Sequence, residues 1–380
     1  HVGEHPPAQA LYIHVPFCAR RCSYCDFSIA IRRVVPSDAF VDAVLVDWNQ
    51  QLQTEPLTRA TTLDTLYLGG GTPSHVAPSA IHRLIEAVQT DRPLVEGAEV
   101  TLEANPDDVT PEAARTWRAA GINRISLGVQ SFHDSVLAWM HRVHDAHAAV
   151  RAMSVLREAG LHDVSVDLIF AVPSSLERDW ERDVAQALSL EPTHISLYGL
   201  TIESGTPLGR WTERGTVHEA PEESYEREFL HAHRALTDAG YAHYEVSNYG
   251  LPGRQARHNS AYWRGVPYLG LGPSAHGYDG RERRWNASAY ADWQRLVDTG
   301  RDPVGGAEIL SLANRDAEAV YLGLRTTGGL EITDAERALA RPWEDAGWVT
   351  VSPDGVLRCT ASGWLRLDSL AATLTAHRSP

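Results

Sequence analysis

The sequence predicts an α/β protein with a parallel β-sheet, either closed into a barrel or open and doubly wound. Short apolar, β-rich runs recur along its first 200 residues, amphipathic helical patterns separate them, and polar motifs follow their carboxyl ends. Such runs are typical of strands buried in a parallel sheet, and their alternation with helices is typical of β/α repeats. The six runs are "LYIHV" (11–15), "TLYLG" (65–69), "EVTLEA" (99–104), "RISLGVQ" (124–130), "VSVDLIF" (164–170) and "HISLYGL" (194–200).

Two of the helices between these runs can be predicted from the spacing of apolar residues. Apolar residues between Phe40 and Leu52 recur at helical intervals after Ser37, which the pattern suggests as an N-cap. A second set between Ile81 and Val88 lies on one helical face. Both patterns predict helices that pack against the sheet.

The chain is predicted to consist of three regions, because the β/α pattern changes after about residue 215. Residues 1–215 form the α/β core, and residues 216–305 form an extension of it. The extension should contain a helix over 222–239, a strand-like run over 241–249 and then a loop region rich in Gly, Pro and aromatic residues through "YLGLGPSAHGY" (268–278).

The third predicted region, residues 306–380, reads as helix, strand, "PDG" turn, strand and helix. This order predicts a small α+β module that resembles a winged helix. The acidity of the segment favours packing or contact with a partner over DNA binding.

Composition and charge exclude several classes of function. The formal net charge is −15, from 49 acidic against 34 basic residues, all of which are arginine. Nucleic-acid binding needs concentrated positive charge, so no nucleic-acid partner is expected. No apolar run approaches the roughly 18 residues of a membrane span, so no span is expected.

The four cysteines of the chain indicate a reducing compartment. Three are clustered, and a chain of 380 residues with so few thiols does not have the disulfide framework of a small secreted domain. We therefore expect a cytoplasmic protein. The fourth thiol, Cys359, is expected to be a partly buried structural residue.

The cysteine cluster follows the first predicted strand with the spacing C-x3-C-x2-C. Its members are Cys18, Cys22 and Cys25. Three thiolates on one short loop can ligate three irons of a [4Fe-4S] cluster and leave the fourth iron open. Zinc is the main alternative and would need a fourth ligand such as His14 or Asp26. Three structural thiols are the other alternative, although Arg20 and Arg21 make the loop a poor core segment.

The stretch "CARRCSYCDF" resembles the signature of the radical S-adenosylmethionine (SAM) superfamily, with Tyr24 at its aromatic position. The resemblance implies a [4Fe-4S] cluster whose open iron binds the amino and carboxylate groups of SAM. Reduction of this cluster then cleaves SAM to methionine and a 5′-deoxyadenosyl radical. The resemblance also implies that the core is a partial (β/α)6 barrel of the TIM type, followed by the winged-helix-like module.

Further motifs narrow the resemblance to one group of radical SAM proteins. In chain order they are "LYIHVPFC", "LYLGGGTPS", "TLEANPDD", "RISLGVQSF", "DLIFAVP", "SLYGLTIESGT", "YEVSNY" and "HNSAYW". Together they are similar to the oxygen-independent coproporphyrinogen III oxidase-like group over about residues 11–370. Within that group the chain is closest to the HemW haem chaperone family.

The same resemblance implies two sets of SAM-binding residues. Those expected beside the first SAM are Tyr12, Gly70 and Glu103. The positions that match a second SAM site in the oxidase are Gly71, Thr72, Gln130, Arg142 and Asp167. Other roles stay open: the glycine run also fits a tight turn, Arg142 a solvated helix position, and Asp167 an orienting contact with nearby backbone. The second set would also fit the substrate side of the barrel.

The hexapeptide "HNSAYW" resembles the H-N-x-x-Y-W motif of the haem chaperones. Its motif residues are His258, Asn259, Tyr262 and Trp263. Histidine is a common axial ligand of haem iron, and aromatic rings can stack on a porphyrin. A single histidine among 18 would more often be structural, so the prediction of haem binding depends on the whole hexapeptide.

The resemblance therefore implies a haem chaperone that binds haem, a [4Fe-4S] cluster and SAM. It would transfer haem to an unidentified acceptor protein, for which a membrane-associated protein is one option. The alternatives are an oxygen-independent coproporphyrinogen III oxidase and a related radical SAM methyltransferase. The oxidase pattern continues with a cysteine where this chain has Phe27, and the hexapeptide disfavours both alternatives.

Overall fold

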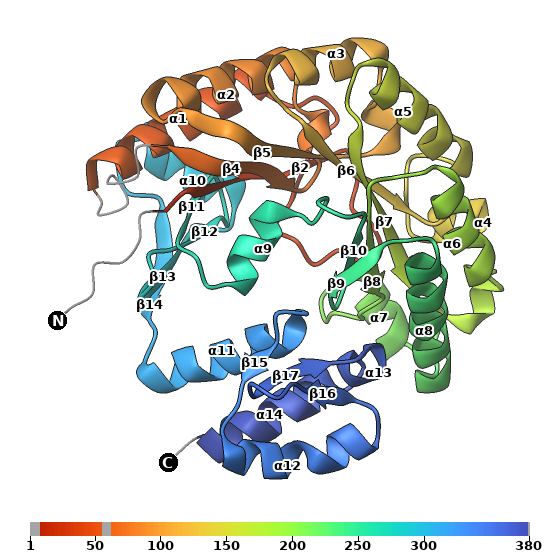
Figure 1. Cartoon of the computed structure of the whole chain (residues 1–380). Coiled ribbons are helices and arrows are strands. Elements are labelled where there is room, and N and C mark those ends of the chain that lie inside the picture. The colour runs from red at the N-terminus through yellow and green to blue at the C-terminus, as the bar shows by residue number, and fades with distance from the viewer. Residues whose placement is uncertain (1–7, 55–61, 379–380) are drawn as a thin grey trace.

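The predicted β/α repeat forms the core of the computed structural model, which describes residues 8–54 and 62–378 (Figure 1). The six predicted strands are present as β1 (Ala10–Val15), β4 (Leu63–Gly70), β5 (Leu94–Ala104), β6 (Arg124–Gln130), β7 (Asp163–Phe170) and β8 (His194–Gly199). Each pairs in parallel with the next. The prediction of an α/β fold with a parallel sheet is confirmed.

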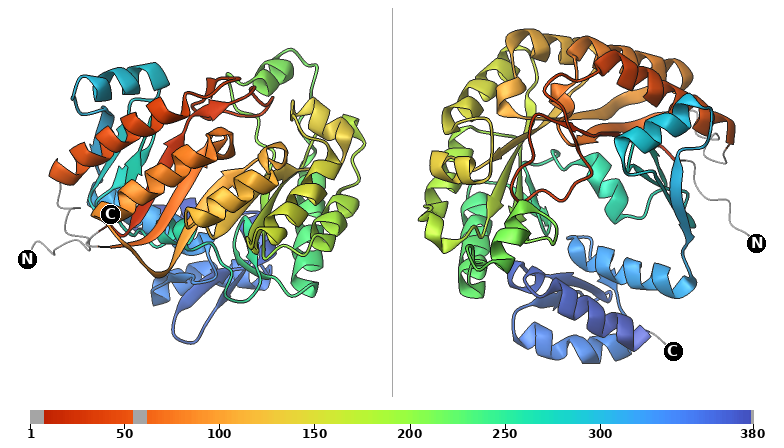
Figure 2. Two further views of the ribbon diagram at one scale, coloured as in Figure 1. Left: turned by 90° about the horizontal axis from the view of Figure 1, so that it is seen from above. Right: turned by 180° about the vertical axis from the view of Figure 1, so that it is seen from behind.

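Helices cover the outer face of this sheet (Figures 1 and 2). They are α1 (Ser37–Thr54), α2 (Pro78–Asp91), α3 (Pro111–Ala119), α4 (Asp134–Trp139), α5 (Ala146–Glu158), α6 (Trp180–Ser189) and α8 (Glu222–Asp238). The two helices predicted from apolar spacing correspond to α1 and α2. The Ser37 hydroxyl accepts a hydrogen bond from the Ala77 amide, so this residue joins the start of α1 to the start of α2.

Short elements connect the strands and helices of the core. They are β2 (Phe17–Cys18), β3 (Ala30–Ile31), the 3-10 helices η2 (Pro73–His75), η3 (Pro106–Asp108) and η4 (Ser174–Leu176), and α7 (Pro207–Glu213). Three of them, β2, η2 and η3, directly follow β1, β4 and β5. They therefore lie at the carboxyl ends of these strands, where sites form in parallel sheets.

The region after α8 is more regular than its sequence predicts. It contains β9 (Ala242–Glu245), β10 (Asn248–Gly250), α9 (Arg257–Trp263), β11 (Tyr268–Leu271), β12 (His276–Tyr278), β13 (Glu282–Asn286), α10 (Tyr290–Asp298) and β14 (Val304–Ile309). The prediction of a loop up to residue 278 is wrong there. The amides of Arg257 and His258 donate to the Glu99 carboxylate of β5, and this distant cap fixes the start of α9.

The strands join into one twelve-stranded sheet in the order β14-β13-β12-β11-β1-β4-β5-β6-β7-β8-β10-β9. Strand β11 extends the parallel part beyond β1, and the outer strands are antiparallel. The sheet curves, and α9 lies inside the curve (Figure 1).

Alternation along the strands separates an apolar from a polar face. In β4, Leu66 and Leu68 are fully buried and belong to the apolar core together with residues of the covering helices, such as Trp48 and Leu84. Thr65 and Tyr67 occupy the alternate positions and contact α9 inside the curve. The interior of the sheet can therefore hold polar groups without disturbing the apolar layer.

The last elements form a small α+β unit below the core in Figure 1. They are α11 (Leu312–Arg325), β15 (Leu330–Glu331), α12 (Asp334–Asp345), β16 (Val349–Val351), β17 (Val356–Cys359), α13 (Ala361–Trp364) and α14 (Leu367–Arg378). The three strands form an antiparallel sheet in the order β15-β17-β16. As expected, Cys359 is buried. The proposed division into three domains stays a prediction.

Among the described helices, none combines the length and the apolar composition needed to cross a membrane.

Candidate functional site

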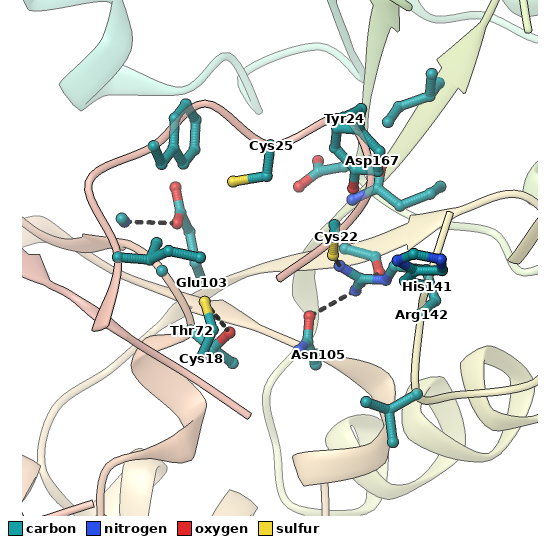
Figure 3. Close-up of a pocket in the computed structure, with 18 of the residues that line it drawn as sticks. Cys18, Cys22, Tyr24, Cys25, Thr72, Glu103, Asn105, His141, Arg142 and Asp167 are labelled. Atoms are coloured by element: carbon teal, nitrogen blue, oxygen red, sulfur yellow. Dashed lines mark hydrogen bonds between the residues drawn. The ribbon is translucent and has the colours of Figure 1, made fainter. Parts of the chain in front are cut away.

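A cavity of about 460 Å³ opens at the carboxyl ends of the parallel strands (Figure 3). Most of the predicted site residues line it: Cys18, Cys22, Tyr24, Cys25, Gly70, Gly71, Thr72, Glu103, Gln130, Arg142 and Asp167. Tyr12 and the four residues of the haem motif are not among the lining residues. The structure thus brings together the residues predicted to bind the cluster and, except for Tyr12, those predicted to bind SAM, and it places the haem motif elsewhere.

The cysteine loop is held over the cavity by a short parallel bridge. Cys18 of β2 pairs with Ile31 of β3, which ties the two ends of the loop together. The three thiols are half-buried. Arg142 and Thr72 approach them from the cavity wall: an Arg142 Nη1–H donates to Cys22 Sγ at 3.6 Å, and the Thr72 hydroxyl donates to Cys18 Sγ at 3.4 Å.

Burial makes the Cys18 and Cys25 thiols hard to ionise on their own. It raises the pKa of the Cys25 thiol to about 11, and it also raises the pKa of Cys18. The Arg21 guanidinium opposes both shifts, because positive charge favours the thiolate. A bound metal would supply the larger positive charge that the thiolate form needs.

The donor set fits a [4Fe-4S] cluster better than it fits zinc. Within the part of the chain that the structure describes, no three Cys, His, Asp or Glu side chains converge on one metal position. His14, considered as a fourth zinc ligand, has both ring nitrogens engaged, with the Tyr12 hydroxyl and the Ser28 carbonyl. A Cβ at Gly71 would lie only 3.0 Å from Cys18 Sγ, so this position leaves room beside the thiol.

Glu103 lies in the cavity wall beside the glycine run. Its carboxylate accepts the Tyr67 hydroxyl at 2.8 Å and the Gly70 amide at 3.0 Å. Gly70 has φ +114°, a conformation that favours glycine. Burial raises the pKa of Glu103 to about 7, and the two hydrogen bonds oppose this shift. Near neutral pH the group therefore exchanges between the carboxylate, which only accepts hydrogen bonds, and the carboxylic acid, which can also donate one.

Tyr12 lies behind this wall. Its hydroxyl is 3.0 Å from His14 Nδ1, and its ring stacks on Tyr67 with 6.0 Å between centroids. It can support Tyr67 but does not itself line the cavity.

The second predicted set comes from several parts of the cavity wall: Gly71 and Thr72 directly follow Gly70, Gln130 ends β6, Asp167 lies on β7, and Arg142 follows α4. The Arg142 Nη2 group donates to Asn105 Oδ1 at 2.6 Å and to the Gly128 carbonyl at 2.8 Å, while its buried Nε–H has no hydrogen-bond partner among the described residues. Arg142 is therefore a fixed cavity residue and not a solvated helix arginine. Gln130 ends β6 in a left-handed conformation, with φ +69°.

Asp167 accepts hydrogen bonds from two serine hydroxyls, at 2.7 Å from Ser126 and at 2.9 Å from Ser165. Burial raises its pKa, and these hydroxyls partly offset the shift. Asp167 is one of the residues that line the cavity (Figure 3).

Sequence analysis missed several residues that line the cavity. They include Tyr67, Asn105, Ser126, His141 and Tyr198. Three of them lie within the motifs "LYLGGGTPS", "TLEANPDD" and "RISLGVQSF", and Tyr198 lies at the end of β8. Strand alternation would have found Ser126, because it shares a face of β6 with Gln130, which was identified.

The haem motif lies on α9, away from the cavity. His258 is 1% exposed; its Nδ1 is 2.7 Å from the Thr65 hydroxyl, and its Nε2 is 2.7 Å from the Tyr262 hydroxyl. Its ring stacks on Tyr67 at 5.0 Å between centroids. Burial lowers the pKa of His258 to about 3, so the imidazole is neutral. Asn259 is half-buried.

Trp263 faces the C-terminal elements. The Arg325 guanidinium of α11 lies 4.2 Å from the centre of its ring, and Arg325 Nε is 2.9 Å from Glu245 Oε2. The end of α9 is therefore joined to α11 by a cation–π contact, and α11 is joined to β9 by the ion pair.

Comparison with known proteins agrees with the geometry. Residues 12–187 match the Radical SAM superfamily. Proteins named heme chaperone HemW are 35% identical in Mycobacterium tuberculosis, over 96% of this chain and 94% of the relative, and 38% identical in Escherichia coli, over 84% and 87%. The corresponding protein of Synechocystis sp. is 36% identical, over 86% and 80%.

Among solved structures, coproporphyrinogen III oxidase (HemN) from Escherichia coli has the same fold. The TM-score is 0.80 at 21% identity, over 98% of this chain and 91% of that one. This likeness supports the fold, whereas the sequence relatives identify the family. The chain belongs to the radical SAM superfamily and, within it, to the family of the heme chaperone HemW.

Proposed function

We propose that this protein is a haem chaperone that holds a [4Fe-4S] cluster and SAM in the cavity, binds haem through the α9 motif and passes haem to an acceptor protein. The observation that carries the proposal is the presence, in one chain, of a three-thiol cavity and an H-N-x-x-Y-W helix. Relatives that match most of the chain are named heme chaperones, which supports it. The acceptor and the cytoplasmic location are part of the proposal.

Cys18, Cys22 and Cys25 would hold the cluster. When bound, it supplies an open iron for SAM and the electron that cleaves the sulfonium. The protein contributes charge and space: Arg142 donates toward Cys22, and Gly71 keeps the wall beside Cys18 free of a side chain. Glu103 and Asp167 provide acceptors for the amino group or ribose hydroxyls of a ligand.

His258 would be the axial ligand of the haem iron, and this role requires α9 to move. Both ring nitrogens are already hydrogen-bonded, and the side chain is enclosed by Tyr67 and Tyr262. Movement of α9 away from Thr65 and Tyr67 of β4 would open space for haem, and a turn of the Tyr262 side chain, which lies on the same helix, would free Nε2 as a neutral nitrogen suited to iron. Because Trp263 contacts Arg325, such a movement also involves α11.

The test is a haem titration after anaerobic reconstitution of the cluster, with the wild type, His258→Ala and the exposed control His147→Ala. We expect a Soret band in the wild type and the control, and its loss in His258→Ala. A parallel assay should detect no conversion of coproporphyrinogen III to protoporphyrinogen. Such conversion would replace the chaperone proposal with the oxidase alternative, and transfer of the SAM methyl group would favour the methyltransferase.

A further inference from the structure

A buried chain of hydrogen bonds runs from the cavity to the start of α9. It begins at Asp167, whose Oδ1 accepts the Ser165 hydroxyl at 2.9 Å, and continues from Ser165 Oγ to His194 Nδ1 at 2.8 Å. His194 Nε2 is 2.7 Å from the Tyr244 hydroxyl, which accepts the amide of Ala256 at 3.1 Å. Ala256 immediately precedes α9.

Chemistry fixes the direction of every donor in this chain. The Ser165 hydroxyl gives its only proton to Asp167, so His194 must donate from Nδ1 to Ser165 Oγ. Burial holds the pKa of His194 well below its usual value, and the neutral ring therefore accepts at Nε2 from the Tyr244 hydroxyl. All the donors point from α9 toward the Asp167 carboxylate.

The residues that form this series of hydrogen bonds are largely shielded from solvent. Ser165 and His194 are each 1% exposed, and Tyr244 is half-buried. In such an environment hydrogen bonds strengthen one another when they are aligned head to tail. A change at one end therefore alters the strength of the bond at the other.

We propose that Ser165, His194 and Tyr244 are positioning residues that couple the occupant of the cavity at Asp167 to the position of α9. A cationic or N–H-donating ligand at Asp167 competes with the Ser165 hydroxyl for the carboxylate. The weaker hydrogen bonds along this series then weaken the hydrogen bond that the Ala256 amide donates to the Tyr244 hydroxyl. This inference rests on the proposed function in taking SAM as the cavity ligand and haem as the ligand of α9.

Through this coupling, SAM in the cavity changes haem binding at α9 without any contact between the two ligands. Tyr67 separates the sites, because it lines the cavity and stacks on His258. By linkage, SAM changes haem affinity by the same factor as haem changes SAM affinity.

The test measures haem affinity of the cluster-loaded protein with and without saturating SAM. In the wild type we expect SAM to change the haem dissociation constant by about 5-fold or more. Tyr244→Phe removes only the linking hydroxyl and should bring the ratio close to 1, with SAM binding retained. The matched control is Tyr249→Phe, which removes a buried hydroxyl that has no hydrogen-bond partner among the described residues and should keep the wild-type ratio.

A second variant separates a relay from simple loosening of α9. Ser165→Ala breaks the chain at its far end and leaves the Tyr244–Ala256 bond in place, so it should also abolish the coupling. If SAM still changes haem affinity in either Tyr244→Phe or Ser165→Ala, the inference is overturned. It is also overturned if SAM changes neither the hydrogen exchange of α9 nor the haem affinity of the wild type.

A readout without haem keeps this inference distinct from the proposed function. Amide hydrogen exchange of residues 256–263 should change when SAM binds to the wild type and stay constant in Tyr244→Phe. If haem fails to bind but this exchange response persists, the haem proposal falls and the relay stands. If haem binds and the exchange response is absent, the relay falls.

Discussion

The cavity and the α9 motif differ in how ready they are for a ligand. The cavity is open, its three thiols are half-buried, and the Nε–H of Arg142 is buried without a partner among the described residues. On α9, His258 is 1% exposed and both its ring nitrogens are hydrogen-bonded. One sequence motif thus lines an open cavity, whereas the other lies in a closed, hydrogen-bonded position.

The difference follows from where each motif lies on the barrel. The cavity residues follow parallel strands, whose carboxyl ends open to the same side. Helix α9 lies inside the curve of the sheet, and Glu99 caps its first amides, so its histidine enters the polar interior. The comparison teaches that ligand access at α9 requires a conformational change that the cavity does not.

The largest expected effect is on cluster formation, which should depend on the cysteine motif and not on the haem motif. Cys22→Ala should prevent formation of the [4Fe-4S] cluster, because two thiols remain for four irons. His258→Ala should leave the cluster intact, since it does not line the cavity. Visible absorbance and iron content after anaerobic reconstitution measure this, with Cys359→Ala as a control thiol. A full cluster in Cys22→Ala would reject the assignment of these thiols.

Arg325, which packs on Trp263 at the end of α9, should contribute strongly to stability through its buried ion pair with Glu245. Arg325→Met leaves Glu245 buried without its cation, at a cost of about 3–5 kcal/mol in the free energy of unfolding. The control is Arg283→Met, whose partner Glu318 is partly exposed, and its cost should stay below about 1 kcal/mol. Denaturant titration measures both. Equal costs would show that the buried Arg325–Glu245 pair contributes no more to stability than an exposed pair.

Acid should destabilise the closed motif through His258. Its pKa is lowered to about 3 in the folded protein from 6.5, so below pH 6.5 the unfolded chain binds a proton that the folded one excludes. Stability from this group is present above pH 6.5 and lost as the pH falls, by about 2 kcal/mol between pH 7 and pH 5. His258→Gln should lose correspondingly less stability over this interval.

Denaturation at the two pH values measures the effect, with the exposed His147→Gln as control. If His258→Gln and the wild type respond equally to acid, His258 is not buried in its neutral form in solution.

These regions also differ in how far sequence could predict them. Strand periodicity and motif order were sufficient for the cavity, because Gly70, Glu103 and Asp167 all follow from the direction of parallel strands. The state of His258 could not be predicted, because its partner Thr65 is 193 residues away and no local pattern records that contact. Tyr12 does not line the cavity, because it lies behind Tyr67, on which its ring stacks.

The smallest expected effect concerns Phe27, which stands where the oxidase pattern has a cysteine. Its side chain is 57% exposed at the cavity rim, so Phe27→Ala removes little buried surface. The free energy of unfolding should change by less than about 0.5 kcal/mol. Phe17→Ala on the same loop is the control: Phe17 is fully buried against Phe40 and Tyr290, and its loss should cost about 3–5 kcal/mol. A large cost for Phe27→Ala would mean that the cavity rim closes over this ring in solution. The contrast between an open cavity and a closed α9 would then be smaller than the structure shows.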